Sequence, residues 1–152
     1  MTNLLGNDGE EASAEELAYW ELAPVEPREF MLEEDSATVV YDLEERTSRF
    51  GEQIILFAKK IPWGPVNNRL IDQLVGAATS VGANYCEADD GVSRADFKHR
   101  ISICRKEARE TKFFLRMVST AEPSLKPIAR ELWKEANSLH LIFSKIWRST
   151  KT

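Results

Sequence analysis

Four stretches of this chain repeat core-type residues at alternating intervals of three and four, the spacing that places them on one face of a helix. In the first stretch, over residues 41–60, this face carries Leu43, Thr47, Phe50, Ile54, Phe57 and Ile61. No segment alternates apolar and polar residues as a half-buried strand does. The chain is therefore predicted to be all-α.

Three further helices are expected over residues 66–89, from a cap at Ser93 to about residue 118, and over residues 124–148. Proline and glycine separate them, at Pro62, Gly64 and Gly91, and Pro123 marks the last break. The face of the fourth helix is expected to carry Leu125, Ile128, Leu132, Ala136, Leu139, Phe143 and Ile146. Helices joined by such short connections pack as antiparallel neighbours, so the pattern predicts an up-down-up-down four-helix bundle.

The charge of the chain is divided unevenly along its length. Residues 1–40 hold eleven acidic residues and one basic residue, a charge of −10, whereas residues 41–152 hold 14 acidic and 19 basic residues, a charge of +5. Residues 1–40 are accordingly interpreted as an acidic, mostly irregular N-terminal leader, and residues 41–152 as the bundle. The capping residues favour a short helix over residues 13–22, and its Trp20 would then dock on the bundle or on a partner. The alternative is that the leader is a plain solvated tail.

The composition indicates a cytoplasmic protein without a membrane span. No apolar run approaches the ~20 residues needed to cross a bilayer, and the acidic N-terminus is not that of a signal peptide. Cys86 and Cys104 fit neither a zinc pattern nor a disulfide framework, and they are expected to be free thiols that fill space in the core.

Two helices carry more apolar surface than a single core face requires. On the third and fourth helices, several large residues lie outside the expected core face: Ile103, Phe113, Phe114, Trp133 and Trp147. Aromatic residues on a second face are typical anchors of subunit interfaces, so these five are predicted to form an oligomer interface. The alternative is a thick core with scattered exposed aromatic side chains.

The segment that joins the second and third helices carries the pattern of a known family. A Ser-x-x-x-Asn-x-x-Glu stretch precedes a glycine turn, a Ser-x-x-Asp-Phe opening follows it, and a Glu-Thr pair lies further along the third helix. These residues are Ser80, Asn84, Glu87, Gly91, Ser93, Asp96, Phe97, Glu110 and Thr111. Over residues 41–148 the chain resembles the four-helix-bundle proteins encoded in intervening sequences of bacterial 23S ribosomal RNA genes, which are related to the accessory variability proteins of diversity-generating retroelements.

This resemblance implies a short bundle that assembles into a ring, often a pentamer. In the retroelement branch it also implies binding to RNA or DNA and to a reverse transcriptase, and it implies no enzymatic activity for the intervening-sequence branch. One departure is the Arg105-Lys106 pair, where many members of the family have Gly-Ser.

Six basic residues form a stripe on the third helix and are the first candidates for a functional site. At 100° per residue they fall within roughly 60° of arc; they are Arg94, Lys98, Arg105, Arg109, Lys112 and Arg116. Such a stripe could follow a phosphate backbone. Alternatively, it is a solvated flank partly paired with acidic residues of neighbouring helices. Because the stripe itself contains no aromatic residue, base stacking is not expected.

Three polar residues, Asn84, Glu87 and Glu110, are predicted to form a structural network with backbone groups or with arginines such as Arg109 and Arg116. No metal, cofactor or catalytic group is expected, because di-iron bundles need two Glu-x-x-His motifs and the chain offers only Asp96-x-x-His99. The sequence thus predicts a non-enzymatic homo-oligomeric scaffold with electrostatic nucleic-acid binding. The alternative is a module that binds a partner protein through its second apolar face.

Overall fold

A computed structural model describes the backbone of residues 18–20 and 36–152, and the side chains of residues 18–20 and 43–152. The chain divides into two compact units, Met1–Glu33 and Glu34–Thr152. In the first unit, residues 18–20 are helical, and the rings of Tyr19 and Trp20 meet edge to face at 5.3 Å. The rest of the helix expected over residues 13–22, and most of the acidic leader, lie outside the described residues.

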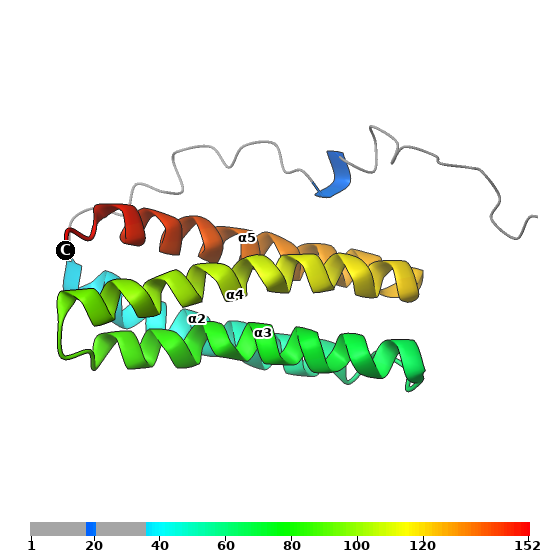
Figure 1. Ribbon diagram of the computed structural model, residues 1–152. Helices are drawn as coiled ribbons and strands as arrows, with labels where there is room; N and C mark the ends of the chain where they lie inside the picture. The colour runs from blue at the N-terminus through cyan, green and yellow to red at the C-terminus, as the bar shows by residue number, and fades with distance from the viewer. Residues whose placement is uncertain (1–17, 21–35) are drawn as a thin grey trace, which may run out of the picture. The chain divides into compact units, whose positions relative to one another are not determined.

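The second unit consists of long helices that run in alternating directions (Figure 1). They are α2 (Ser36–Ala58), α3 (Pro65–Asp89), α4 (Arg94–Ala121) and α5 (Lys126–Ser149), with a short 3₁₀ helix, η2 (Pro123–Leu125), before α5. The described residues contain no strand, so the prediction of an all-α antiparallel four-helix bundle is confirmed. The expected helix ends are close to the observed ones, except that α2 begins at Ser36 rather than near residue 41.

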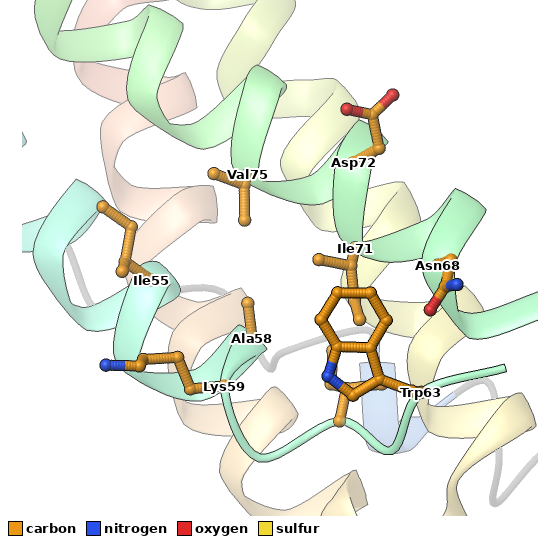
Figure 2. Close-up of a pocket in the computed structure, with 9 residues that line it drawn as sticks. Ile55, Ala58, Lys59, Trp63, Asn68, Ile71, Asp72 and Val75 are labelled. Atoms are coloured by element: carbon orange, nitrogen blue, oxygen red, sulfur yellow. The ribbon is translucent and has the colours of Figure 1, made fainter.

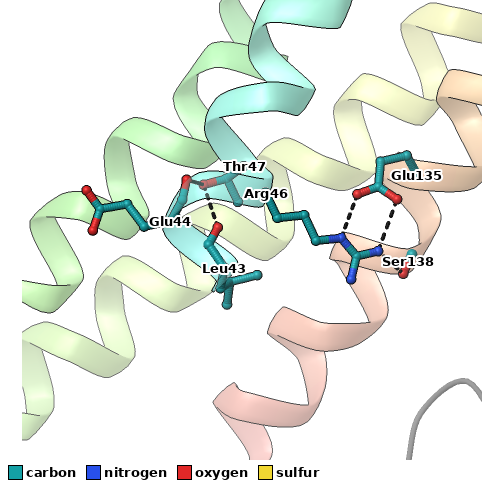
Figure 3. Close-up of polar contacts among 6 residues, drawn as sticks. All are labelled: Leu43, Glu44, Arg46, Thr47, Glu135 and Ser138. Carbon is teal, nitrogen blue, oxygen red and sulfur yellow. Dashed lines mark hydrogen bonds and ion pairs between the residues drawn. The ribbon is translucent and has the colours of Figure 1, made fainter. Parts of the chain in front are cut away.

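Each helix packs against two neighbours, in the order α2, α3, α4, α5 and back to α2. The bundle therefore has four sides, and the α2–α3 side lies opposite the α4–α5 side. The contact between α2 and α5 is the least extensive of the four. A polar bridge spans it, because Arg46 donates to both carboxylate oxygens of Glu135, at 2.7 and 3.0 Å, and to Ser138 at 2.8 Å (Figure 3).

The core is the set of faces that the spacing predicts. All six residues expected on the face of the first helix are buried, including Ile61, which lies beyond the end of α2 at Ala58. The largest fully buried side chains in the bundle include Phe50, Phe57 and Phe143. Burying each such side chain contributes roughly 1.5–3 kcal/mol. The buried hydroxyl of Thr47 donates to the carbonyl of Leu43 at 2.9 Å (Figure 3), so it leaves no unsatisfied donor in the core.

Three of the seven core positions expected on the fourth helix are not fully buried: Leu125 and Ile146 are half-buried, and Ile128 is exposed. Ile128 is 40% exposed, and the neighbouring Ala129 is fully buried in its place. The buried residues of α5 then step from Ala129 to Leu132, Ala136, Leu139 and Phe143. The alternating spacing holds, but it starts one residue later than expected, at Ala129.

The connection between α3 and α4 depends on local side-chain chemistry. The hydroxyl of Ser93 accepts from the amide of Asp96 at 3.1 Å and donates to the Asp96 carboxylate at 2.8 Å, which caps the start of α4. A Cβ added at Gly91 would lie 2.9 Å from the carbonyl oxygen of Ala88. Any larger residue would therefore have to shift the turn that the cap follows.

The small residues of α3 admit a neighbouring helix at one position and not at another. A Cβ added at Gly82 would meet Thr47 Oγ1 of α2 at 3.4 Å, whereas nothing lies within 4 Å of a Cβ added at Gly76. Gly82 thus permits close approach of α2. Gly76 only costs backbone entropy within the subunit.

We therefore expect Gly76→Ala to raise the free energy of unfolding by about 1 kcal/mol, because alanine favours the helix and meets no obstacle. Urea unfolding followed by circular dichroism measures this change. Gly82→Leu serves as the opposite control and should lower stability, since its side chain would press on Thr47. A loss of stability in Gly76→Ala would show that another surface covers this position.

Candidate nucleic-acid interface

The six cations of the predicted stripe lie along one flank of α4. Arg94 and Arg109 are exposed, and the remaining four are half-buried: Lys98, Arg105, Lys112 and Arg116. The flank faces α5, since Lys112 Nζ donates to Asn137 Oδ1 of that helix at 2.9 Å. The stripe is thus one border of the α4–α5 side of the bundle.

Two tryptophans of α5 lie among these cations. The Trp147 ring lies beneath Lys98 Nζ and the Arg105 guanidinium, at 5.0 and 4.5 Å from the ring centroid. The Trp133 ring lies 5.2 Å from Lys112 Nζ. Aromatic rings therefore do interleave with the stripe, contrary to the prediction, because they come from the neighbouring helix. We call the six cations together with Trp133 and Trp147 the α4–α5 face.

None of the six stripe cations forms an ion pair with any described residue. The acidic residues pair elsewhere: Glu135 with Arg46 at 2.7 Å, Glu87 with Arg100 at 2.6 Å and Glu110 with Lys106 at 3.9 Å. These contacts therefore do not support the alternative in which acidic residues of neighbouring helices neutralise the stripe. Positive charge is therefore left unbalanced along the flank of α4 that faces α5.

His140 is a titratable group whose pKa is shifted by burial and, to a smaller extent, by this positive charge. Burial, followed by the charges of Lys112, Arg109 and Arg105, lowers the pKa of His140 to about 4. Burial and the neighbouring Arg109 also lower the pKa of Lys112. His140 is consequently neutral at physiological pH, and it adds a polar aromatic ring to the α4–α5 face without adding charge.

The predicted polar network forms around a residue that sequence reasoning did not name. Arg100 donates to Asn84 Oδ1 at 3.2 Å and pairs with the Glu87 carboxylate at 2.6 Å, which ties α4 to α3. The partners expected for this network, Arg109 and Arg116, lie on the other flank of α4. Glu110 takes no part in it and pairs with Lys106.

The five residues predicted as one oligomer interface lie on two sides of α4. Trp133 and Trp147 belong to the α4–α5 face. Phe113 and Phe114 contact each other edge to face and line a hollow of about 530 Å³ with Gln73 of α3. Ile103 is half-buried and lies 11 residues, or three turns, before Phe114 on the same flank.

Another apolar surface lies where α2 meets α3, and sequence reasoning missed it. Trp63 is 89% exposed, and Leu56, Val66 and Ile55 are 61%, 66% and 43% exposed. Figure 2 shows Trp63 at the edge of a hollow of about 500 Å³, with Ile55 of α2 and Val75 of α3 at its far side. We call these residues the Trp63 face. The signal for it was Pro62-Trp63-Gly64, a large aromatic residue in a tight connection that no helix can cover.

No catalytic or metal-binding arrangement is found within the residues that the structure describes. No three side chains of the metal-ligating types (His, Cys, Asp or Glu) gather there. Cys104 is buried, and its pKa rises to about 12 through that burial, which disfavours a thiolate nucleophile. Cys86, predicted to be core filler, is instead exposed. None of the described helices is both long and apolar enough to cross a bilayer.

Comparisons with known proteins agree with this fold. A family model described as "23S rRNA-intervening sequence protein" matches residues 40–145. A crystal structure from Bacteroides thetaiotaomicron, titled as a protein with unknown function from the S23 ribosomal protein family, has 24% sequence identity and a TM-score of 0.64, over 72% of this chain and 98% of that chain. No curated protein matches the chain. Neither description of the two matches names a reaction.

The depressed pKa of His140 makes a prediction about stability and pH. Folding favours the neutral ring, so this contribution is complete above the usual pKa of 6.5 and is lost as pH falls toward 4. We expect the melting temperature of the native protein to fall further between pH 7 and pH 4.5 than that of His140→Asn. His99→Asn, which removes the other histidine, is the control. Parallel curves for the native protein and His140→Asn would contradict the prediction.

Proposed function

The chain belongs to the 23S rRNA-intervening sequence protein family, and we propose that it is a non-enzymatic scaffold that binds RNA or DNA through its α4–α5 face and assembles with copies of itself. The observation that carries the nucleic-acid part is the row of six cations on α4, which has no acidic partner among the described residues. A polyanion would supply the negative charge that no described side chain places beside these cations.

The geometry of the row suits a phosphate backbone. From Arg94 to Arg116 the stripe spans 22 residues of α4, which is about 33 Å of helix. Lysine and arginine side chains on a rigid helix hold their register, and each phosphate contact releases condensed counterions. The unpaired cations therefore favour a binding that is sequence-tolerant and strongly dependent on salt.

Self-association is argued from the Trp63 face. Trp63, Leu56 and Val66 are large side chains that a solitary subunit leaves mostly in water. Tryptophan in a desolvated pocket is the commonest kind of interface anchor, and an exposed apolar cluster of this kind marks a contact surface. A second copy of the chain is the partner that we assign to this face, with Trp63 rather than Phe113 as the central anchor. The resemblance implies that such copies form a ring, often a pentamer.

A second candidate function uses the same face. Asp72 and Asn68 border the apolar hollow beside Trp63, so a partner protein with a matching apolar segment would find polar groups at the rim, as in most protein interfaces. In that case the chain is a protein-interaction module, and nucleic-acid binding is absent. A reverse-transcriptase partner, which the resemblance to the retroelement branch implies, belongs to this class and stays a prediction.

The charge of the α4–α5 face provides the test of nucleic-acid binding. We expect Arg105→Glu/Arg109→Glu/Lys112→Glu to abolish binding to generic RNA and DNA at about 50 mM salt, because three phosphate contacts become repulsions. Fluorescence anisotropy with labelled oligonucleotides measures it. Arg49→Glu/Lys60→Glu/Arg69→Glu is the matched control, since it changes the net charge equally at exposed positions outside the α4–α5 face and outside the hollow beside Trp63. Equal loss in both variants, or no binding by the native protein, would exclude the proposed site.

The Trp63 face provides the test of assembly. We expect light scattering to give a mass well above the 17.3 kDa of one chain, and Leu56→Asp/Trp63→Asp to lower it to that of a monomer, because two carboxylates would have to be desolvated in the interface. Phe113→Asp, at a residue that is 55% exposed, is the control and should keep the native mass. A monomeric native protein would instead favour the partner-protein function, and dissociation by Phe113→Asp alone would move the interface to α4.

A further inference from the structure

The α4–α5 face combines cations with aromatic rings, and a stripe that binds only phosphates does not need the rings. Trp147 lies under Lys98 and Arg105, and Trp133 lies near Lys112. Both rings are half-buried, so part of each remains open to solvent. The two tryptophans are 14 residues apart on α5, which places them about 21 Å apart along the helix.

Each ring faces cations that can be exchanged for a base. A cation over a partly exposed aromatic ring is a weak contact, whereas a base stacked on an aromatic side chain buries both flat surfaces and tolerates any base. When a base replaces Arg105 on Trp147, the guanidinium is released toward the adjoining phosphate, where it forms a charge-assisted hydrogen bond. The exchange therefore gains stacking and an ion pair, and it loses only the weaker contact.

The side chains between the tryptophans are compatible with a strand of bases. Asn137 and His140 lie four and seven residues after Trp133, on the same flank of α5. The Asn137 amide already accepts from Lys112 at 2.9 Å, and His140 is neutral beside the cations of α4. These groups offer polar contacts to base edges, and neither brings a negative charge against the phosphates.

We propose that the α4–α5 face takes single-stranded nucleic acid in preference to duplex, with bases stacked on Trp133 and Trp147 and phosphates held by the cations of α4. This inference rests on the nucleic-acid binding proposed above. In a duplex the base faces are already stacked on one another, and exposing one requires that stacking to be broken. A duplex can therefore use the cations but not the rings.

The test compares an RNA strand of about 20 nucleotides with the duplex of the same sequence, by fluorescence anisotropy. We expect the native protein to bind the single strand more tightly, and Trp133→Leu/Trp147→Leu to weaken that binding by about tenfold or more while duplex affinity changes by less than about twofold. Trp133→Phe/Trp147→Phe should restore most of the loss, because phenylalanine also stacks. Phe113→Leu, which removes an exposed aromatic residue outside both the α4–α5 face and the Trp63 face, should bind as the native protein does.

A second measurement keeps the proposal testable if the leucine variant folds poorly. The chain has four tryptophans, so Trp20→Phe/Trp63→Phe leaves only Trp133 and Trp147 to fluoresce. We expect the single strand to quench this fluorescence and the duplex to leave it nearly unchanged. The salt dependence of single-strand binding should be the same with and without the two rings, because stacking releases no counterions.

The outcomes separate this inference from the function on which it rests. If both probes bind, charge reversal on α4 abolishes both, and loss of the two tryptophans changes neither affinity, the face binds phosphates alone and the stacking proposal is wrong. Strong quenching by duplex would overturn it as well. If the native protein binds neither probe, the proposed nucleic-acid function fails first, and the preference for single strands fails with it.

Discussion

Each helix of this bundle can bury only one stripe of its surface, and the rest of the structure depends on that constraint. In α4 the buried stripe runs through Ile101, Cys104, Ala108 and Leu115. Since α4 packs against both α3 and α5, its two flanks form borders with different neighbours. The chemistry of each border is set by what the neighbouring helix supplies.

The two flanks of α4 differ in electrostatic character for this reason. Toward α3, Arg100 is neutralised by Glu87 and hydrogen-bonded to Asn84. Toward α5 the charged side chains of the α4 stripe are all basic. The residues of α5 that lie beside them are tryptophans and a neutral histidine. Cation–aromatic contacts hold the lysines and arginines against the bundle without cancelling their charge. The positive field is therefore a built feature of the fold, and it adds to the larger effect of burial in lowering the pKa of His140.

Sequence periodicity was sufficient to predict the helices, but it was insufficient to predict which side chains meet where two helices border each other. The spacing of large side chains identified every helix and nearly all buried positions; it failed at Ile128, where only the neighbouring helices decide whether Ile128 or Ala129 faces inward. It also identified the stripe, because that pattern lies on one helix. It missed Arg100 as the centre of the polar network, the tryptophans beside the cations and the Trp63 face, since each requires knowing which residues of two helices meet.

The two proposed surfaces are compatible because of where the bundle places them. The Trp63 face lies on the α2–α3 side, which is opposite the α4–α5 side in the cyclic order of the helices. An assembly joined through Trp63 would leave every cationic face outward and accessible. Joining subunits through Trp133 and Trp147 would instead bury Arg105 and Lys112 without acidic partners, at a desolvation cost that no described contact offsets. Separate surfaces also allow several weak nucleic-acid sites to act on one strand, so that avidity, rather than any single contact, determines how tightly the strand is held.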